Sequence, residues 1–362
     1  MVGREPGSRP FVTIGVTTYN RHELLRQALH SILAQSFGDF EVIVGNDYTE
    51  EVLGGEMFGI TDPRIRFINH PRNLREVGNM NALLEMATGR YFTWLFDDDL
   101  YQPNFLRTAH DCLAANAFPP AFFPSYRDLL VTDVYQPRQV PPRPPLVLSG
   151  RQFLDGYFAG RLKLVSTCGL FETAALRETV GGVEELCDSA IGVYCEYLFL
   201  LRCALLDRIV YMGSPFVVMR AHAGSWSESN SELEKYVEAG KGLVRKGGEV
   251  LRHPALSADF SANLMGVCRL HLITFAYRSA RLEVARRRFG AGAVLRAMAR
   301  HWKETAATRR SFLGQGGGGG WRIRLGFVRL QAVSCAIIVF QILYYFYYSH
   351  IGMKLRPRQP GQ

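Results

Sequence analysis

Between Phe11 and about Leu113 the chain alternates short apolar runs with segments that repeat apolar residues at helical spacing. The runs are rich in Val, Ile, Phe and Thr, the composition of strands buried on both faces, and they span 11–17, 40–46, 65–69 and 91–96. Strands that alternate with helices form parallel sheets through right-handed crossovers. The sequence therefore predicts an α/β domain with a mixed, mainly parallel sheet flanked by helices.

Two segments between these runs have the apolar spacing of helices. One apolar helical face precedes the second run, and another precedes the fourth and ends at Gly89, a residue suited to a helix stop. The residues of the two faces are Leu24, Leu25, Ala28, Ile32 and Leu33, and then Met80, Leu83, Leu84 and Ala87. Later in the chain, a helix is expected near 194–206 and a strand near 209–219.

Charge divides the chain into two parts. Residues 1–240 hold 21 Lys and Arg against 29 Asp and Glu, whereas residues 241–362 hold 21 against 4. Parts of opposite charge are expected to have different partners. The predicted organisation is an N-terminal tail at 1–9, the α/β domain at 10–230, a basic helical region at 231–314, a Gly-rich hinge at 315–320, and a membrane-associated helix with a basic tail at 321–362.

Composition indicates the class of protein and the cellular compartment in which it folds. With 48% apolar and 21% charged residues, the chain is globular rather than disordered or collagen-like. Its seven cysteines are odd in number and never two residues apart, which argues against a disulfide framework and a structural zinc site and fits a reducing compartment. No apolar stretch of the kind found in a signal peptide precedes Phe11, so a cytoplasmic location is expected.

The basic part predicts contact with an anionic membrane. Arginines between 286 and 300 alternate with apolar residues, as in a helix that lies on anionic lipid. The arginines are Arg286, Arg287, Arg288, Arg296 and Arg300, and the apolar residues are Val284, Phe289, Val294, Leu295 and Met298. Neither a nucleic-acid-binding module nor aromatic residues interleaved with the arginines are visible, so nucleic acid is not expected as a partner.

One uncharged segment could enter a bilayer. Residues 330–348 lack charge over 19 residues. At about 1.5 Å per residue this helix covers roughly 28 Å, close to the thickness of a hydrocarbon core. Its last five residues are aromatic, as at bilayer interfaces. Spanning the membrane, lying in its plane and packing on the α/β domain all remain open, because Gln331, Ser334 and Gln341 suit the last two as well. Positive charge flanks both ends, so the orientation is open too.

Polar residues follow the predicted strands, where open parallel sheets bind ligands. Asp47 follows the second run, and Asp97, Asp98 and Asp99 follow the fourth. Adjacent carboxylates repel one another unless a cation lies among them, and Mg²⁺ or Mn²⁺ shared with a diphosphate is the simplest such cation. The alternative is a solvated turn or a helix N-cap, since a helical pattern opens near Pro103.

Taken together, these residues resemble family 2 glycosyltransferases of the GT-A fold. The motifs are 18–21 after the first run, the run ending at Asp47, Asn81 ahead of 87–91, and 96–99 followed by Pro103. The resemblance covers roughly residues 10–225. It implies metal-assisted transfer of a sugar from a nucleotide-diphosphate sugar to an acceptor hydroxyl, with inversion at the anomeric carbon.

The resemblance also implies roles for individual residues. The nucleotide is expected to contact Thr17, Thr18, Tyr19, Asn20, Arg21, Asp47, Asn81, Asp97 and Asp98. Asp98 or Asp99 is expected to hold the metal. The family often has an Asp where Phe96 stands, so the register of the metal-binding pair within 97–99 is open. A later family motif resembles the segment around His222, which is a metal-ligand candidate or an ordinary turn residue.

The resemblance places a general base on a helix after the sheet, several residues before an Arg. Glu196, ahead of Arg202, fits that position, with Asp188 in reserve. A carboxylate suits the task because partial burial can raise its pKa toward neutrality. The alternative is that Glu196 forms a structural ion pair with Arg202 or Arg208.

The predicted function is a membrane-associated, inverting glycosyltransferase that uses Mg²⁺ or Mn²⁺. Its acceptor would be a saccharide or a lipid-linked saccharide in cell-surface polysaccharide or glycolipid assembly, on the cytoplasmic side of the membrane. The first alternative is a catalytically inactive membrane adaptor with the same fold. A nucleotidyltransferase is the second, but it should lack the base on the later helix.

Overall fold

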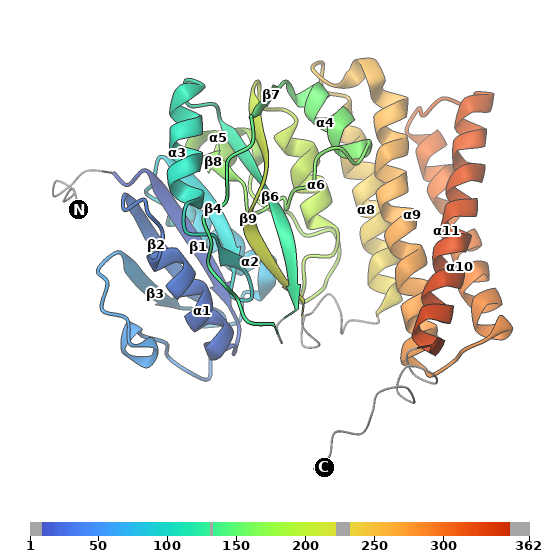
Figure 1. The fold of residues 1–362 in the computed structure, drawn as a ribbon. Coiled ribbons are helices and arrows are strands. Elements are labelled where there is room, and N and C mark those ends of the chain that lie inside the picture. Colours follow the sequence, from blue (N-terminus) through green and yellow to red (C-terminus); the bar gives the residue numbers. More distant parts are fainter. Residues whose placement is uncertain (1–8, 131–132, 222–231, 348–362) are drawn as a thin grey trace, which may run out of the picture. The chain divides into compact units, whose positions relative to one another are not determined.

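The computed structural model describes residues 9–130, 133–221 and 232–347 (Figure 1). The chain forms two compact units. The sheet unit comprises Met1–Glu185, Ala190–Ser229 and His253–Leu256, and the helical unit comprises Leu186–Ser189, Asn230–Arg252 and Ser257–Gln362.

The sheet unit is built on one mixed sheet. Its strand order is β3-β2-β1-β4-β8-β6-β9-β5, and β7 pairs with β9. The strands are β1 (Val12–Thr18), β2 (Phe40–Asn46), β3 (Ile65–Asn69), β4 (Tyr91–Phe96), β5 (Leu100–Tyr101), β6 (Ala121–Leu130), β7 (Leu146–Leu148), β8 (Leu170–Glu172) and β9 (Ile209–Ala221). The long pairings β1–β2, β1–β4, β2–β3 and β6–β9 are parallel, and the shorter ones are antiparallel. The predicted fold class, a mixed and mainly parallel sheet with helices, is confirmed.

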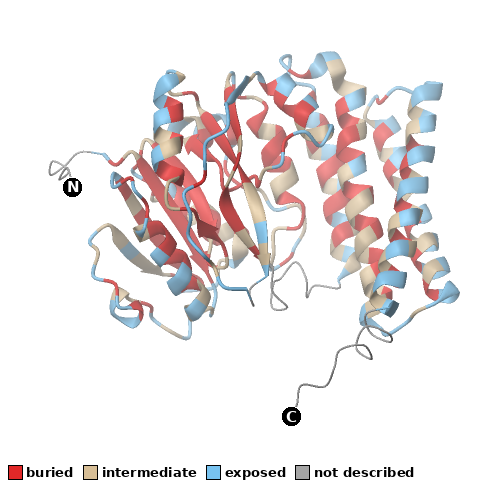
Figure 2. Ribbon diagram, in the orientation of Figure 1, coloured by how far each residue is buried: buried red, intermediate tan, exposed pale blue. Residues whose placement is uncertain are grey.

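Helices connect these strands and cover the sheet. They are α1 (His22–Leu33), α2 (Arg75–Glu85), α3 (Phe105–Ala115), α4 (Gly150–Phe158), α5 (Thr173–Ala175) and α6 (Cys195–Cys203), with a 3₁₀ turn at Gly55–Phe58 and a π turn at Leu176–Val180. Every residue of β1 is buried, and α1 buries the apolar side predicted for it, including Leu25, Ala28 and Ile32 (Figure 2). Continuous apolar strands and amphipathic helices therefore meet as their sequence patterns require.

The sequence pattern does not reveal β6, β8 or α4. The longest of these, β6, pairs in parallel with β9 from Ala121↔Ile209 to Leu130↔Ala221, and the register shifts at Pro124 and Ser125. A proline inside a strand is typical of a bulge, and it obscures the strand in the sequence. The Pro-rich segment 137–145 contains neither helix nor strand.

The parallel pairings bring the ends of three strands together. Thr18 at the end of β1 lies beside Asn46 at the end of β2, and Thr17 lies beside Phe96 at the end of β4. Because parallel strands share one carboxyl edge, the residues that follow β1, β2 and β4 converge there. The candidate site is built on this edge.

The helical unit contains four long helices, α8 (Leu233–Leu251), α9 (Phe260–Ala285), α10 (Ala291–Gly314) and α11 (Trp321–Tyr347), with a 3₁₀ turn at Ser257–Asp259. The chain turns between α9 and α10, where Arg287 and Gly290 have positive φ angles of 52° and 86°. The prediction that residues 284–300 form one helix lying on lipid is therefore wrong. Val294 and Met298, assigned to its lipid side, instead pack against a core of Ala276, Ala280, Ala293, Ala297, Ile338 and Ile342.

Buried polar contacts join α9 to α10. Glu283 is fully buried and pairs with Arg296 and Arg300 at 3.0 and 2.8 Å. His271 Nε2 and Glu304 Oε1 lie 3.0 Å apart. In the glycine run between α10 and α11, Gly317 is packed, since a Cβ there would meet the Phe312 ring at 2.3 Å, whereas a Cβ on Gly316, Gly319 or Gly320 would meet open space.

Candidate functional site

Side chains from three strand ends meet at the carboxyl edge of the sheet. The Thr18 hydroxyl donates to Asp97 Oδ2 at 2.8 Å. Backbone bonds from Asp97 N to Thr17 O (3.2 Å) and from Asp47 N to Thr18 O (3.1 Å) hold the same edge together. Asn20 has a positive φ of 51° and turns the chain from β1 toward α1. The predicted residues Thr17, Thr18, Asp47 and Asp97 therefore lie together.

Arg21 bridges two of the three carboxylates that follow β4. Its Nη1 lies 3.0 Å from Asp97 Oδ1 and 3.0 Å from Asp98 Oδ2. The Asp98 side chain is 16% exposed and that of Asp97 is 4% exposed, so Asp98 is the more accessible of this pair. Arg21 was expected to contact a nucleotide, and the structure shows that it also neutralises part of the carboxylate cluster.

Arg220, at the end of β9, is the second counterion, and the sequence analysis missed it. Its peptide N–H donates to Asp99 Oδ1 at 3.1 Å, and its guanidinium donates to the carbonyl oxygens of Asp97 and Asp98. The side chain is buried and also bonds the Leu24 carbonyl oxygen at 3.2 Å. The antiparallel pairing of β9 with β5, Leu100↔Val218, holds Arg220 near the carboxylates. Arg220 lies in the segment 219–225 that resembles a later family motif, but the sequence analysis gave a role only to His222 in that segment.

Burial makes the carboxylate cluster hard to ionise. It raises the pKa of Asp97 to about 6, with the Asp98 charge adding to the rise and Arg21 opposing it. Burial and Asp98 also raise the pKa of Asp99 well above its ordinary value, against the pull of Arg220. Two arginines thus offset part of the repulsion, which therefore does not by itself demand a metal ion.

The donor set still fits a hard divalent cation that keeps most of its ligands from elsewhere. Within 9–130, 133–221 and 232–347, no three His, Cys, Asp or Glu side chains are arranged to hold a metal. Asp98 and Asp99 could supply carboxylate oxygens, while phosphate oxygens and water would complete the shell, as Mg²⁺ prefers. His222 lies outside the described residues.

Other predicted nucleotide contacts have structural partners. Asp47 is buried, and its Oδ1 accepts from Leu74 N at 2.6 Å, next to the start of α2. Burial raises the pKa of Asp47, and the bond from Leu74 opposes that rise. Both ends of the Asn81 amide bond the backbone of Val183, at 2.7 and 3.0 Å. Asn81 thus anchors the chain near Val183 in this structure.

Two aromatic rings stand beside Asp47. Tyr19 is 39% exposed, and its ring meets that of Tyr48 edge-on with 5.4 Å between centroids. Exposed aromatic faces can stack on a planar base. The sequence analysis identified Tyr19 but not Tyr48, whose ring is placed by the chain that follows β2.

Glu196 lies in the first turn of α6, as predicted. Its Oε2 accepts from the Ser166 hydroxyl at 3.0 Å. Burial raises the pKa of Glu196, and the Ser166 bond opposes that rise. Arg202 pairs with Glu184 and Arg208 donates to the Ala117 carbonyl oxygen, so the predicted alternative partners of Glu196 are engaged elsewhere.

Glu196 and the Asp cluster belong to one electrostatic neighbourhood. The buried Cys168 thiol has a pKa raised by burial first, and then by the charges of Asp99 and Glu196. Glu196 and Asp99 both lie close enough to the buried Cys168 for their charges to act on its thiol. The reserve candidate, Asp188, belongs to the helical unit.

Glu76 is a further carboxylate that the sequence analysis missed. Its Oε2 accepts from Gly192 N at 3.1 Å, and its own N–H donates to the Ala190 carbonyl oxygen at 3.3 Å. Burial raises its pKa to about 7, and the charges of Glu196 and Asp98 add to the rise. An acidic residue in the first turn of a helix is ordinary, so the sequence alone does not single it out.

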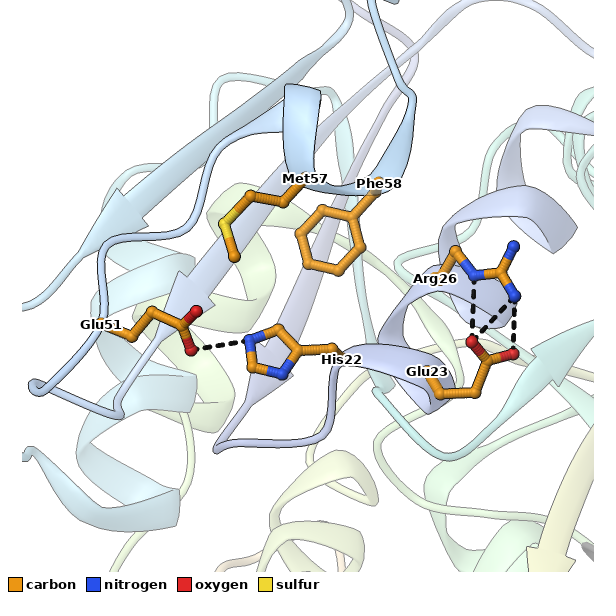
Figure 3. A pocket seen from close by; sticks show the side chains of 6 residues that line it. All are labelled: His22, Glu23, Arg26, Glu51, Met57 and Phe58. Carbon is orange, nitrogen blue, oxygen red and sulfur yellow. Dashed lines mark hydrogen bonds and ion pairs between the residues drawn. The ribbon is translucent and has the colours of Figure 1, made fainter.

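A cavity of about 350 Å³ opens beside the start of α1 (Figure 3). It is lined by His22, Glu23, Arg26, Glu51, Met57 and Phe58. His22 pairs with Glu51 at 2.9 Å, and Glu23 pairs with Arg26 at 2.8 Å. Its charged groups already have partners, and we assign it no ligand.

Comparison with known proteins finds a family model for the part of the chain that carries these residues. The model of glycosyl transferase family 2 matches residues 13–117, which run from β1 through α3 and include Asp47 and the Asp cluster. This region of the chain is therefore similar to glycosyl transferase family 2.

Two bacterial relatives share this region. The succinoglycan biosynthesis protein ExoO of Rhizobium meliloti is 36% identical over 98 residues, which are 27% of this chain and 28% of ExoO. A GalNAc(5)-diNAcBac-PP-undecaprenol beta-1,3-glucosyltransferase of Campylobacter jejuni is 36% identical over 93 residues, 25% of this chain and 30% of the relative. The chain thus spans less than a third of the length of either relative.

One solved structure resembles a larger part of the chain. Residues 1–349 of TarS from S. aureus, crystallised with UDP-GlcNAc, match 84% of this chain and 88% of TarS 1–349, with 15% identity and a TM-score of 0.49.

Proposed function

We propose that the chain transfers a sugar from a nucleotide-diphosphate sugar to an acceptor hydroxyl, with inversion at the anomeric carbon. The proposal rests on the Asp cluster at the carboxyl edge of the sheet and on Glu196, because Asp99 and Glu196 both lie close enough to Cys168 for their charges to raise the pKa of its thiol. Transfer with inversion needs these two functions in one site. One group must take a proton from the acceptor, and another must receive the charge that develops on the leaving diphosphate.

Glu196 is the proposed general base. Its burial and raised pKa suit a carboxylate that takes the acceptor's proton as the hydroxyl attacks. Ser166 fixes the orientation of the carboxylate through its 3.0 Å bond to Oε2. The acceptor oxygen would approach the anomeric carbon from the face opposite the diphosphate, so that a single displacement inverts that carbon.

The Asp cluster and its arginines form the proposed donor side. Asp98 and Asp99 would hold Mg²⁺ or Mn²⁺, with His222 as a further candidate ligand. A bound divalent cation supplies electrostatic stabilisation of the leaving diphosphate. Arg21 already contacts Asp97 and Asp98 and would add positive charge beside the nucleotide. Tyr19, with Asp47 nearby, would contact the base, and Asn20 would shape the turn beneath it.

The proposed acceptor is a saccharide, free or lipid-linked, in cell-surface polysaccharide or glycolipid assembly. The names of the two relatives support this class, because one concerns succinoglycan and the other an undecaprenyl-diphosphate-linked glycan. We place the protein on the cytoplasmic side of the membrane. Support comes from its seven cysteines, all within the described residues, since no disulfide joins any two of them. No observation favours the inactive adaptor over the enzyme.

A thermal-shift screen of the full chain against nucleotide-diphosphate sugars, with and without Mn²⁺, tests the proposal. One sugar nucleotide should stabilise the chain, and Mn²⁺ should enlarge the effect. A ligand at a hundred times its dissociation constant contributes about 2.7 kcal/mol. Asp98→Asn should lose the Mn²⁺-dependent part. The matched control is Asp128→Asn, because the Asp128 side chain is 73% exposed.

Transfer itself is then measured with the donor that the screen identifies and a panel of saccharide and lipid-linked acceptors. Product analysis should show the inverted anomer. An Asp98→Asn, Asp99→Asn double variant that transfers sugar at the parent rate would overturn the metal assignment. Stabilisation by no nucleotide sugar, with or without metal, would overturn the donor class.

A further inference from the structure

The exposed charges of α9, α10 and α11 share one sign. Between Phe260 and Tyr347 the sequence contains fourteen Lys and Arg and two acidic residues, Glu283 and Glu304. Both acidic residues are buried, at 0% and 6% exposure. Eleven of the basic residues are exposed, namely Arg269, Arg286, Arg287, Arg288, Arg296, Lys303, Arg309, Arg310, Arg322, Arg324 and Arg329. The outer surface of these three helices therefore carries only positive charge.

The last helix adds an apolar surface to this charge. One side of α11 is buried within the helical unit, and its members are Phe327, Leu330, Ser334, Ile338 and Ile342. The residues on the other side from 332 onward are exposed and carry no charge. They are Ala332, Val333, Ala336, Phe340, Leu343, Tyr344 and Tyr347, and Phe340 and Leu343 are 62% and 55% exposed. We call these seven residues the outer face of α11.

The two surfaces are consecutive along one helix. Exposed arginines occupy the first part of α11, at 322, 324 and 329, and the outer face begins three residues later. The exposed and buried sides of α11 are visible in Figure 2. A uniformly positive surface beside exposed Leu, Phe and Tyr matches an anionic bilayer, where phosphate headgroups meet hydrocarbon. Nucleic acid would leave the apolar side chains without partners.

Contacts on the buried side of α11 determine how much of the helix can enter the bilayer. Ile338 and Ile342 are fully buried against the alanines of α9 and α10. The Gln331 amide lies 3.1 Å from His301 Nδ1, a partly buried polar contact between α11 and α10. The apolar window of α11 has a mean hydropathy of 1.8, and 28% of it is buried. A helix that crosses the bilayer alone would have to give up these contacts.

We propose that the helical unit docks on an anionic bilayer with α11 parallel to the membrane, its outer face inserted among the lipids and its inner face still packed on α9 and α10. The exposed arginines of α10 and α11 would contact lipid phosphates. Docking requires no glycosyl transfer, so it holds or fails independently of the catalytic site. Glu196→Gln, which would stop transfer, should bind vesicles as the parent chain does.

Flotation of the full chain with vesicles tests the surface. The vesicles are phosphatidylcholine alone, or phosphatidylcholine with about one third phosphatidylglycerol, at low and high salt. We expect binding to the anionic vesicles only, weakened by salt. Arg309→Gln with Arg310→Gln should weaken it by roughly fivefold for each arginine near the surface. Equal binding to both vesicle types would overturn the electrostatic part.

A second pair of variants tests the apolar part. Phe340→Asp with Leu343→Asp should abolish flotation, whereas the matched control Val52→Asp, at a site 76% exposed in the sheet unit, should leave it unchanged. A circular dichroism melt checks that each variant is folded. Flotation of the Phe340, Leu343 variant at the parent level would overturn the assignment of the outer face.

Two further measurements distinguish the proposed docking from two alternatives, a helix that spans the bilayer and a second copy of the chain on the outer face of α11. Chain bound to vesicles should be released by an alkaline carbonate wash, and resistance to that wash would show a spanning helix and overturn the parallel orientation. Light scattering in solution should give one mass for the parent and for the Phe340, Leu343 variant. A parent dimer that this variant converts to a monomer, without vesicle binding, would assign the outer face to a second copy of the chain.

Discussion

The sheet unit and the helical unit bury charge in opposite ways. In the sheet unit the acidic residues Asp97, Asp98 and Asp99 gather at a strand edge, and Arg21 and Arg220 turn toward them. On α9, α10 and α11 of the helical unit the acidic residues Glu283 and Glu304 are buried, and Arg296 and Arg300, which pair with Glu283, remain 46% and 28% exposed. The first arrangement keeps carboxylates available to a ligand, and the second leaves a cationic surface. Each unit is thus suited to a different kind of partner.

The largest expected effect tests whether a carboxylate of the sheet unit is chemically active. Glu196→Gln should lower the transfer rate by about 10²- to 10⁴-fold, because a neutral amide cannot take the acceptor's proton. Initial rates with the identified donor measure this loss, and urea unfolding checks the fold. Ser166→Ala keeps the carboxylate but removes a bond that lowers the pKa of Glu196. Its rate should fall less, and the acid limb of its pH profile should move upward. A full rate with Glu196→Gln would refute the base assignment.

The next comparison removes a counterion from each unit. Arg220→Met should destabilise the chain by about 3–5 kcal/mol, since it removes a buried guanidinium charge that opposes the raised pKa of Asp99 and leaves the carbonyl oxygens that it bonds without their donor. Glu283→Gln should cost less, about 1–3 kcal/mol, because the Arg296 and Arg300 side chains it releases are 46% and 28% exposed and can reach water. Urea unfolding gives both values. A smaller cost for Arg220→Met than for Glu283→Gln would break the contrast between the units.

A third test uses pH on the sheet unit. The pKa of Glu76 is raised from its ordinary 4.5 to about 7, so the folded chain binds its proton more tightly than the unfolded chain does. Stability should therefore fall as pH rises from about 4.5 to 7, by roughly 1–3 kcal/mol for this group. Glu76→Gln keeps an acceptor for Gly192 and removes the titration. Its unfolding free energy should drop less between pH 5 and pH 8 than the parent's, and an identical drop would show that Glu76 does not titrate there.

The smallest effect comes from a pair that belongs to neither arrangement. Arg245 and Glu249 form an exposed pair at 3.1 Å, one helical turn apart on α8. Arg245→Ala should change the unfolding free energy by about 0.3–0.5 kcal/mol, and less in high salt. Urea unfolding at two ionic strengths measures it. A loss above 1 kcal/mol, the upper bound for exposed pairs, would mean that exposed charges matter more here than burial, contrary to the comparison of the two units.

Local patterns predicted the parts of the molecule in which each element carries its own signal. The strands β2, β3 and β4 have the predicted bounds, because strands buried on both faces are apolar throughout. The Asp cluster and Glu196 were found for a similar reason, since each lies at a recognisable end of an element. The roles of the predicted site residues remain predictions.

The missed features depend on pairing between distant parts of the chain. Arg220 lies more than a hundred residues from the Asp cluster and reaches it through the pairing of β9 with β5 and β6. The strand β6 has no clear alternation, since its Pro124 lies at a bulge. Within 284–300 the spacing of arginines and apolar residues resembled one helix, and only the positive φ angles at Arg287 and Gly290 reveal the turn. The spacing of residues along the sequence does not show which distant strands pair or where the chain turns between two helices.

The bond between Arg220 N–H and Asp99 has a consequence for biosynthesis. The region matched by the family ends at residue 117, but the counterion of its carboxylates is made about a hundred residues later. A nascent chain that has emerged only as far as α3 would present its acidic triplet with Arg21 alone. The Asp cluster therefore gains its second counterion only after β9 has been translated. A truncated product that ends before residue 209 should lack this counterion.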